Sequence, residues 1–456
     1  MRPYHVAIVG SGPSGFFAAA SLLKAADSST TSDGFDVVVD MLEMLPTPWG
    51  LVRSGVAPDH PKIKSISKQF EKTATDPRFR FFGNIFVGEH VEAADLAERY
   101  DAVIYAVGAQ SDRALNIPGE DLPGSVAAVD FVGWYNAHPN FHEMAPDLSG
   151  ARAVVIGNGN VALDVARILI TDPEALAVTD IANHALDSLR PRGVEEVVVV
   201  GRRGPLEAAF TTLELRELAD LESVDVIVDP DQLEGINEED AAAAGKTIKQ
   251  NIKALRDYAG REPRPGHRRM VFRFLTSPIE IKGDGKVESI VLGANKLVAD
   301  DSGRVAAEDT GEREELPVQL IVRSVGYRGV PIPGLPFDDK SATIPNAAGR
   351  VEGSRNDYVV GWIKRGPTGV IGTNKKDSQD TVDTLLSDLA GAQDVKDFPG
   401  DHADRLADWL ASCQPRLVTS DHWDVIDRHE RAAGEPHGRP RVKLPNLAEL
   451  LRIGHR

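Results

Sequence analysis

Two glycine-rich turns contain the residues of this chain that could bind nucleotides. The first follows a β-branched run, residues 4–9, and reads Gly-Ser-Gly-Pro-Ser-Gly over residues 10–15 before an apolar helical stretch. In such a strand–turn–helix unit Gly10 permits the tight turn, Gly12 lets backbone N–H groups approach a pyrophosphate, and Gly15 allows close helix packing. The helix N-terminus then faces the phosphate charge. The arrangement predicts a dinucleotide site, with a purely structural turn as the alternative.

An acidic residue ends the next predicted strand. Residues 36–42 form a buried-looking run that ends in Glu43, where a carboxylate can accept hydrogen bonds from an adenosine ribose. Glu43 lies farther from the glycines than the usual spacing of about 20 residues, because the polar stretch 27–34 lengthens the connection. A solvated carboxylate at a strand end is the alternative.

The same pattern recurs near the middle of the chain. An apolar run, residues 153–156, leads into Gly-Asn-Gly-Asn-Val-Ala over residues 157–162, and an amphipathic helical stretch follows. This is the GxGxxA variant of the dinucleotide turn. Gly157 and Gly159 are therefore candidate cofactor contacts.

The strand after this second turn ends in arginines instead of an acid. The run 196–200 is followed by Gly-Arg-Arg-Gly. A guanidinium binds phosphate through a bidentate fork, whereas a carboxylate there would repel a 2′-phosphate. Arg202 and Arg203 thus favour NADP over NAD, with a solvated basic loop as the alternative. If the second turn binds NADP, the first is assigned to FAD, because a hydride donor needs an acceptor that stores two electrons.

Two apolar strands that stop at a glycine indicate where the chain passes between domains. One stops at Gly108 and the other at Gly326. We expect an NADP-binding domain, residues 111–325, inserted into a FAD-binding domain formed by residues 1–110 and 326–456. The predicted fold class is α/β, with two dinucleotide-binding (Rossmann-like) domains.

Composition narrows the class of protein. The 456 residues include 51 Lys and Arg against 69 Asp and Glu, a formal charge of −18 at pH 7, which argues against general nucleic-acid binding. The lone Cys413 excludes a Cys-ligated cluster or a dithiol pair within the chain, and we expect no metal site. No apolar run reaches the roughly 18 residues of a membrane helix, and no signal-peptide pattern opens the chain, so a cytoplasmic location is expected.

Glycines also recur late in the chain, in the stretch Tyr-Val-Val-Gly-Trp-Ile-Lys-Arg-Gly-Pro-Thr-Gly-Val-Ile-Gly-Thr-Asn over residues 358–374. They leave backbone N–H groups accessible before a helix expected to begin near Lys375 or Asp377, so this loop could contact a flavin ring and a second nucleotide. Trp362 is a candidate flavin neighbour, and an ordinary core tryptophan is the alternative.

Three segments closely resemble the NADPH:ferredoxin reductases of the adrenodoxin reductase family. They are residues 46–62, Pro-Thr-Pro-Trp-Gly-Leu-Val-Arg-Ser-Gly-Val-Ala-Pro-Asp-His-Pro-Lys; residues 200–206 with 209–211 and Glu214; and residues 362–371. The matches follow the family's order over nearly the whole chain, which resembles a bacterial member. The resemblance implies an electron-transport flavoprotein, a ferredoxin-NADP⁺ reductase, in which hydride passes from NADPH to FAD and single electrons then pass to an iron–sulfur ferredoxin.

The resemblance also implies individual site residues. Those implied for non-covalently bound FAD are Ser14, Glu43, Leu51, Val87, Trp362, Gly369, Val370 and Ile371. Those implied for NADP are Arg113, Asn158, Gly159, Asn160, Val161, Arg202, Arg203, Glu214 and Gly369. By the same resemblance Glu214 could hold the nicotinamide carboxamide, and His60 could orient groups or handle a flavin proton.

An acidic ferredoxin would need a local basic surface on so acidic a chain. The lysines and arginine that fall on one face of a predicted helix, opposite its apolar residues, could steer such a partner; they are Lys246, Lys249, Lys253 and Arg256. A solvated helix face is the alternative. Basic residues between 261 and 273 extend this candidate, and the tail from Arg428, with the basic run 439–443, is a weaker second one.

The sequence leaves two other functions open. An NADPH-dependent flavin monooxygenase would oxidise NADPH in step with an organic substrate. A non-catalytic NADPH-sensing flavoprotein would show slow flavin reduction and no turnover. Disulphide-reducing flavoenzymes need a paired dithiol, which a chain with one cysteine cannot form.

Overall fold

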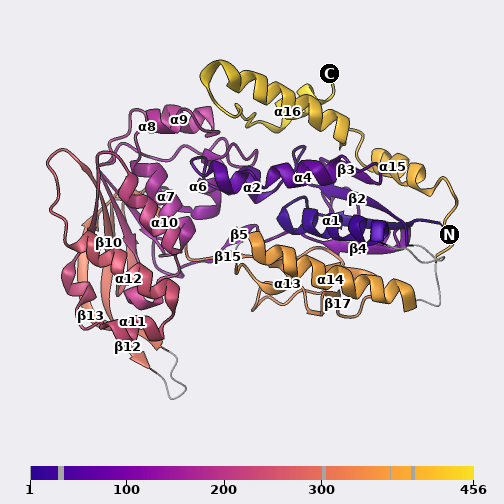
Figure 1. The fold of residues 1–456 in the computed structure, drawn as a ribbon. Helices are drawn as coiled ribbons and strands as arrows, with labels where there is room; N and C mark the ends of the chain where they lie inside the picture. The colour runs from indigo at the N-terminus through magenta and orange to yellow at the C-terminus, as the bar shows by residue number, and fades with distance from the viewer. Residues whose placement is uncertain (1, 29–34, 300–304, 370, 392–395) are drawn as a thin grey trace. The chain divides into compact units, whose positions relative to one another are not determined.

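The chain folds into two compact units. The structure is a computed structural model that describes residues 2–28, 35–299, 305–369, 371–391 and 396–456. Unit 1 comprises Met1–Val56, His60–Ser111 and Gly326–Arg456, and unit 2 comprises Ala57–Asp59 and Asp112–Val325. The colour gradient of Figure 1 shows that unit 1 contains both ends of the sequence, so unit 2 is inserted into unit 1.

Unit 1 is built on an eight-stranded sheet in the order β16–β17–β18–β4–β1–β2–β3–β19. The central strands β18, β4, β1, β2 and β3 are parallel, and the outer strands β16, β17 and β19 are antiparallel to their neighbours. The strands are β1 (Tyr4–Val9), β2 (Val37–Glu43), β3 (Phe79–Gly83), β4 (Ala102–Tyr105), β16 (Asn346–Ala347), β17 (Arg350–Val351), β18 (Asp357–Val359) and β19 (Val418–Thr419).

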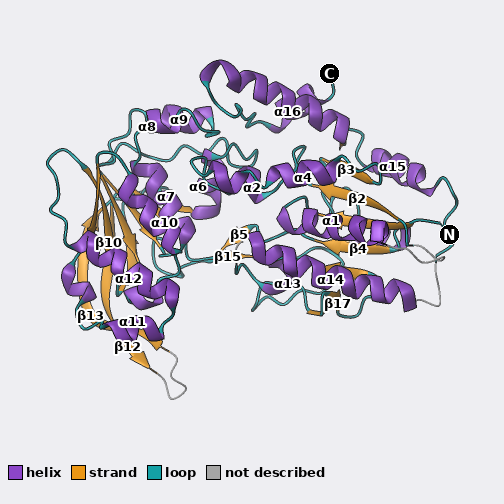
Figure 2. Ribbon diagram, in the orientation of Figure 1, coloured by secondary structure: helices purple, strands orange, loops and turns teal. Residues whose placement is uncertain are grey.

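Helices bury both faces of this sheet, as Figure 2 shows. Along β1, Val6 and Ile8 join one apolar cluster and Ala7 and Val9 join another, because successive side chains of a strand point to opposite faces. The helices are α1 (Pro13–Ser28), α2 (Leu51–Ser54), α3 (Pro61–Lys64), α4 (Ser67–Ala74), α5 (Ala93–Arg99), α13 (Trp362–Arg365), α14 (Ile371–Gly391), α15 (His402–Cys413), α16 (Ser420–Gly434) and α17 (Leu447–Gly454). Although far apart in sequence, α1 and α14 pack together.

Unit 2 is built on a six-stranded parallel sheet in the order β6–β14–β7–β8–β10–β9. Its strands are β6 (Ser125–Ala127), β7 (Arg152–Ile156), β8 (Glu196–Val200), β9 (Val224–Val228), β10 (Arg268–Arg273) and β14 (Leu320–Arg323). Its helices are α6 (Ala128–Tyr135), α7 (Asn160–Ile170), α8 (Pro173–Leu176), α9 (Asn183–Leu189), α10 (Thr212–Glu217), α11 (Glu238–Ala243) and α12 (Lys246–Ala259).

The two faces of the six-stranded sheet have different covers. On one face Val155 packs in a cluster with helical residues such as Leu163. On the other, Val154 packs with Ile281 and Ile290, which belong to an antiparallel three-stranded sheet of β11 (Thr276–Lys282), β12 (Ser289–Ala299) and β13 (Val305–Pro317). A second sheet thus takes the place of a helical layer in unit 2.

The predicted fold class is confirmed, because each unit has a Rossmann-like sheet with parallel central strands that contains a strand, a glycine turn and a helix in succession. The short strands β5 (Ser111–Asp112) and β15 (Tyr327–Arg328), where the chain passes between units, form a two-stranded sheet. Within the described ranges, the model contains no helix with the length and apolar character needed to cross a membrane.

Candidate dinucleotide sites

The first glycine turn joins β1 to α1. Gly10 has a φ of 104°, which side chains other than glycine rarely adopt. A Cβ on Gly15 would lie 2.2 Å from the Gly10 carbonyl oxygen, so only glycine permits this approach of helix to strand. By contrast, no described heavy atom lies within 4 Å of the position of a Cβ on Gly12. The turn is therefore tight where it packs and open where a phosphate would approach. Ser14 follows on α1 and is buried.

Glu43 lies against this turn. Its carboxylate ends β2, is buried, and accepts hydrogen bonds from the Ser11 N–H (3.0 Å), the Ser11 hydroxyl (2.5 Å) and the Leu45 N–H (3.1 Å). Burial raises the pKa of Glu43, and the bonds from Ser11 and Leu45 oppose that rise. The sequence analysis did not identify Ser11 as a site residue. Its position between the first two glycines of the turn could have indicated that role.

Residues 46–55 pack over the same turn. The Trp49 N–H donates to the Ser11 carbonyl (3.1 Å), and a Cβ on Gly50 would lie 2.8 Å from the Cα of Gly12. Leu51 begins α2 and is 37% exposed, an open apolar position next to the turn. Val87, the other apolar residue assigned to FAD, is buried.

A buried ion-pair network anchors α2. Glu430 on α16 is fully buried and pairs with Arg53 (2.6 Å) and Arg441 (3.2 Å). Burial alone would raise the pKa of Glu430, but the two guanidinium groups hold it below its usual value. Part of the second candidate docking surface, the tail from Arg428, was wrong: Arg439, Arg441 and Lys443 are all buried, and two of them are bound to this network, whereas Arg428 is exposed.

The loop between α13 and α14 holds the late cluster of glycines. Trp362 begins α13 and stacks on Tyr327 with ring centroids 5.6 Å apart. Its indole N–H is buried and has no hydrogen-bond partner among the described residues. Gly369 has a φ of 82°, Ile371 begins α14, and Val370 lies outside the described residues.

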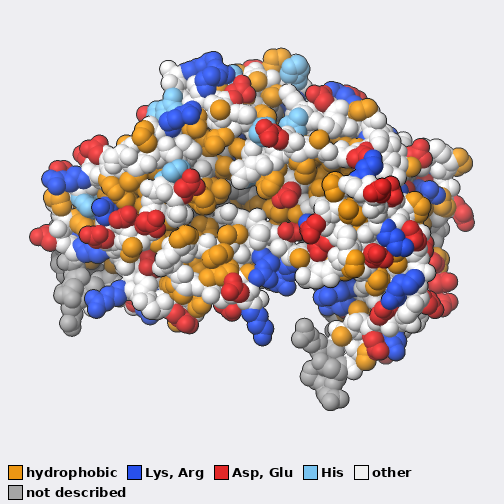
Figure 3. Space-filling model, turned by 180° about the vertical axis from the view of Figure 1, so that it is seen from behind, with side chains coloured by type: hydrophobic (Ala, Val, Ile, Leu, Met, Phe, Trp, Pro, Cys, Tyr) orange, Lys and Arg blue, Asp and Glu red, His pale blue; other side chains and the backbone are white. Residues whose placement is uncertain are grey.

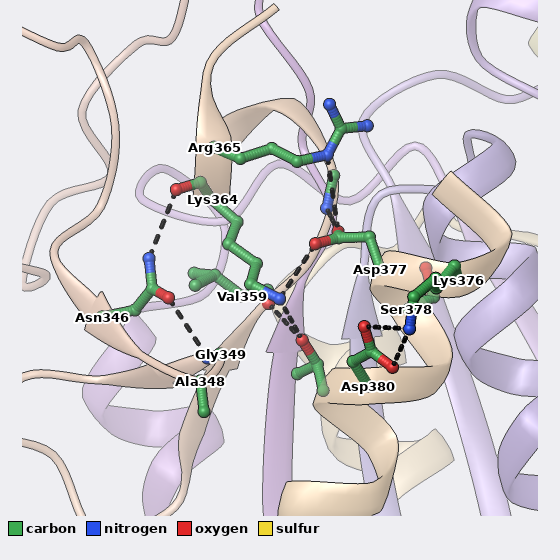
Figure 4. Close-up of polar contacts among 12 residues, drawn as sticks. Asn346, Ala348, Gly349, Val359, Lys364, Arg365, Lys376, Asp377, Ser378 and Asp380 are labelled. Atoms are coloured by element: carbon green, nitrogen blue, oxygen red, sulfur yellow. Dashed lines mark hydrogen bonds and ion pairs between the residues drawn. The ribbon is translucent and has the colours of Figure 1, made fainter. Parts of the chain in front are cut away.

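Asp377 on α14 connects that helix to α13. It accepts hydrogen bonds from the Gly361 N–H (2.6 Å) and pairs with the Lys364 ammonium (2.9 Å). Figure 4 shows Lys364 and Arg365 directed toward Asp377. The expected helix start near Lys375 or Asp377 was too late, because Asn374 is already helical and its side chain binds Arg365.

The second glycine turn joins β7 to α7 and repeats the first geometry. A Cβ on Gly157 would lie 2.1 Å from the Ser324 carbonyl oxygen, whereas the Cβ position of Gly159 has no described atom within 4 Å. The Asn160 side chain accepts from the Thr211 N–H (2.8 Å). The side-chain amide nitrogen of Asn158 is buried and has no hydrogen-bond partner among the described residues. Val161 is half-buried on α7.

Arg202 and Arg203 follow β8. Arg202 is exposed and Arg203 half-buried, and within the described part of the chain no hydrogen bond or ion pair engages either guanidinium. Arg113, also in unit 2, is exposed. Two unengaged guanidinium groups on one turn are suited to an external phosphate.

Glu214 lies elsewhere in unit 2, on α10, and is buried. Its carboxylate is 3.8 Å from the Arg167 guanidinium, which also pairs with Asp59 (2.6 Å) and Asp164 (2.8 Å). Sequence reasoning missed Arg167, because an arginine on the buried face of α7 has no signature until its carboxylate partners are known. His60 belongs to unit 1, where it directly precedes α3.

The residues of both turns fit dinucleotide cofactors. Trp362 and Asn158 present buried N–H donors without a protein acceptor in the described ranges, and buried donors are normally satisfied. Gly12 and Gly159 leave open space at the turns. The acid-ended first turn suits the ribose of FAD, and the arginine-ended second turn suits NADP.

Comparison with known proteins gives consistent matches. A family model described as pyridine nucleotide-disulphide oxidoreductase matches residues 4–246. NADPH-ferredoxin reductase FprA of Mycobacterium leprae (strain TN) is 82% identical, with 100% of each chain covered. The mitochondrial NADPH:adrenodoxin oxidoreductase of Salvelinus fontinalis is 42% identical, with 98% of this chain and 90% of that protein covered. A solved structure of Mycobacterium tuberculosis FprA in complex with NADPH is 79% identical with a TM-score of 0.98, and 100% of both chains is covered.

Proposed function

Because this chain belongs to the pyridine nucleotide-disulphide oxidoreductases and, among them, to the adrenodoxin reductase family of NADPH:ferredoxin reductases, we propose that it oxidises NADPH and reduces an iron–sulfur ferredoxin with FAD as its bound cofactor. The observation that carries the proposal is the pair of unlike turns in one chain. One turn ends at a buried acid, Glu43, and the other at two unengaged arginines.

Unit 1 is the proposed FAD-binding unit; the predicted FAD-binding domain, residues 1–110 and 326–456, differs from it only at residues 57–59 and 111. The open backbone at Gly12 admits the pyrophosphate, and Glu43, held in place by Ser11, accepts hydrogen bonds from the ribose. The partnerless indole N–H of Trp362 is available as a donor to the flavin. When bound, FAD supplies the ability to take up a hydride and release electrons one at a time, which no side chain provides.

Unit 2 is the proposed NADP-binding unit; the predicted NADP-binding domain, residues 111–325, differs from it only at residues 57–59 and 111. Arg202 and Arg203 bind the 2′-phosphate, and the amide of Asn158 donates to the dinucleotide. Glu214 holds the nicotinamide carboxamide, and the Arg167 guanidinium, 3.8 Å away, supplies a positive charge that favours the ionised carboxylate. His60 orients polar groups or handles a proton at the flavin.

The family description includes disulphide chemistry, which this chain does not support by itself. Cys413 is its single cysteine and is half-buried on α15. A dithiol pair within one chain is therefore impossible, and the electrons must leave the flavin for an external acceptor.

We further propose an acidic ferredoxin and a docking surface for it on α12. Lys246, Lys249, Lys253 and Arg256 are exposed, whereas the apolar residues of the opposite side of the helix are buried. Charged side chains of both signs are intermixed on the face drawn in Figure 3, and Arg264, Arg269 and Arg273 are already paired with acids. On α12, Lys249 pairs with Glu238 (3.6 Å), whereas Lys246 and Lys253 have no acid partner among the described residues. These two exposed lysines favour the α12 surface over the segment 261–273. A cytoplasmic location stays a prediction.

The test is anaerobic reduction of an oxidised ferredoxin by the purified yellow protein with NADPH. We expect steady loss of the oxidised ferredoxin spectrum only when protein, NADPH and ferredoxin are all present. NADPH consumption that follows an added organic substrate and ignores ferredoxin would refute the proposal.

A further inference from the structure

The turn that carries the arginine pair is attached to the three-stranded sheet of unit 2. Three successive carbonyls, those of residues 201–203, each accept a hydrogen bond. The donors are the Thr276 N–H (3.0 Å), the side-chain amide of Asn295 (2.9 Å) and the Leu275 N–H (3.0 Å), in that order. Because all three donors come from β11, β12 or the residue before β11, this sheet fixes the path of the backbone at Arg202 and Arg203.

Asn295 is the one side chain among these donors. It lies on β12, where the pairing with β13 shifts register between Gly293 and Asn295, and it is buried. The extra residues at this shift belong to β13, since Gly293 pairs with Arg313 and Asn295 with Asp309. The amide nitrogen has two hydrogens, and both are used: one bonds the Arg202 carbonyl and the other the Ser277 hydroxyl (2.8 Å).

Leu275 completes the attachment in a strained conformation. Its φ is 50°, in the left-handed region. Its N–H donates to the Arg203 carbonyl (3.0 Å), and its own carbonyl accepts from the Asn295 N–H (2.7 Å). A leucine persists in this region only where its surroundings fix it, and such strain is concentrated at functional sites.

We infer that Asn295 is a positioning residue for recognition of the adenosine 2′-phosphate. It bonds the carbonyl of Arg202 and so fixes the direction in which two guanidinium groups without protein partners leave the turn. The inference rests on the proposed function, in which these arginines bind the phosphate of NADP. It gives the three-stranded sheet a role in the choice between NADP and NAD.

The test compares two nucleotides that differ by the 2′-phosphate alone, 2′,5′-ADP and 5′-AMP, in calorimetric titrations of the FAD-loaded protein. Asn295→Ala should weaken binding of 2′,5′-ADP about threefold to tenfold, which corresponds to one neutral hydrogen bond, and leave 5′-AMP unchanged within about twofold. Ser277→Ala is the matched control, because it removes the other acceptor of the same amide; it should leave both affinities unchanged.

Two further variants make the result decisive. Asn295→Ser keeps a polar group at this position of β12, but its hydroxyl is too short to reach the Arg202 carbonyl, so it should behave like Asn295→Ala even if the alanine variant folds poorly. In an Arg202→Ala background, Asn295→Ala should have no further effect on the ratio of the two affinities, because the group that it positions is gone.

Each contrary result identifies what failed. If the Asn295 variants weaken both nucleotides equally, or neither, the residue does not position the phosphate site and the inference is overturned, while the proposed function stands. If the unaltered protein binds both nucleotides with the same affinity, the assignment of the 2′-phosphate to the arginine pair is wrong, and the inference is overturned with it.

Discussion

Replacing Glu43 with glutamine is expected to weaken FAD binding through one lost acceptor. The carboxylate is buried and accepts from Ser11 twice and from Leu45 once. A carboxylate presents two acceptor oxygens, whereas an amide presents one oxygen and a donor nitrogen. Whichever way the amide turns, its NH₂ group faces a backbone N–H that it cannot bond, that of Ser11 or that of Leu45, although the Ser11 hydroxyl could rotate to accept from it. At least one acceptor position for the ribose is lost in either case.

The expected magnitude follows from the charge on the lost acceptor. A hydrogen bond to a charged group contributes about 1.5–3 kcal/mol, so the Kd for FAD should rise roughly 10-fold to 150-fold. The folded apoprotein should be affected less. Burial raises the pKa of Glu43, so the ionised form is costly to bury, and a neutral amide removes that cost.

The assay is a titration of FAD-free protein with FAD, followed by flavin fluorescence. Ser11→Ala is the matched control, because it removes one donor to Glu43 and leaves the carboxylate in place. The control should raise the Kd by no more than about tenfold. A Kd for Glu43→Gln within twofold of the unaltered protein would show that the carboxylate does not bind the ribose, and would refute the assignment of the first turn.

Three other predictions concern stability and docking. The pKa of His5 is lowered to about 4, by burial first and by nearby His402 second, so the folded state favours neutral imidazole. The free energy of unfolding should therefore fall as pH drops from about 6.5 toward 4. In urea titrations, His5→Phe should make the free energy of unfolding less dependent on pH over this range. The same pH dependence in the variant and in the unaltered protein would contradict this role of His5. Glu430→Gln breaks a fully buried ion-pair network and should cost about 3–5 kcal/mol of unfolding free energy; a loss under about 1 kcal/mol would contradict the proposed anchoring. Lys253→Glu on α12 should raise the KM for ferredoxin several-fold at low salt and less at high salt, whereas Lys286→Glu, outside α12, should not; equal effects would refute that docking surface.

The glycine turns were predictable because their requirements are local. Gly10 needs a positive φ and Gly15 a close helix–strand approach, and both needs are visible in the spacing of glycines between a β-branched run and a helix. The end of the following strand is local too, so Glu43 and the arginine pair could be read from the sequence.

Residues that act across the fold could not be found in this way. Arg53 and Glu430 are 377 positions apart, and nothing near either predicts their pairing. The basic run 439–443 was wrongly assigned to the surface for the same reason, since burial depends on what α16 and α2 pack against. Asn295 and Arg202 are 93 positions apart, and no sequence pattern in this chain indicates that their strands bring them together.

The most direct test of the central claim is anaerobic stopped-flow absorbance of the FAD-loaded protein, mixed first with NADPH or NADH and then with oxidised ferredoxin. The account predicts rapid bleaching of the visible flavin band that is faster with NADPH than with NADH, followed by reoxidation whose rate rises with ferredoxin concentration. Bleaching at equal rates with both nucleotides would contradict the 2′-phosphate assignment, and reoxidation indifferent to ferredoxin would contradict the reductase function.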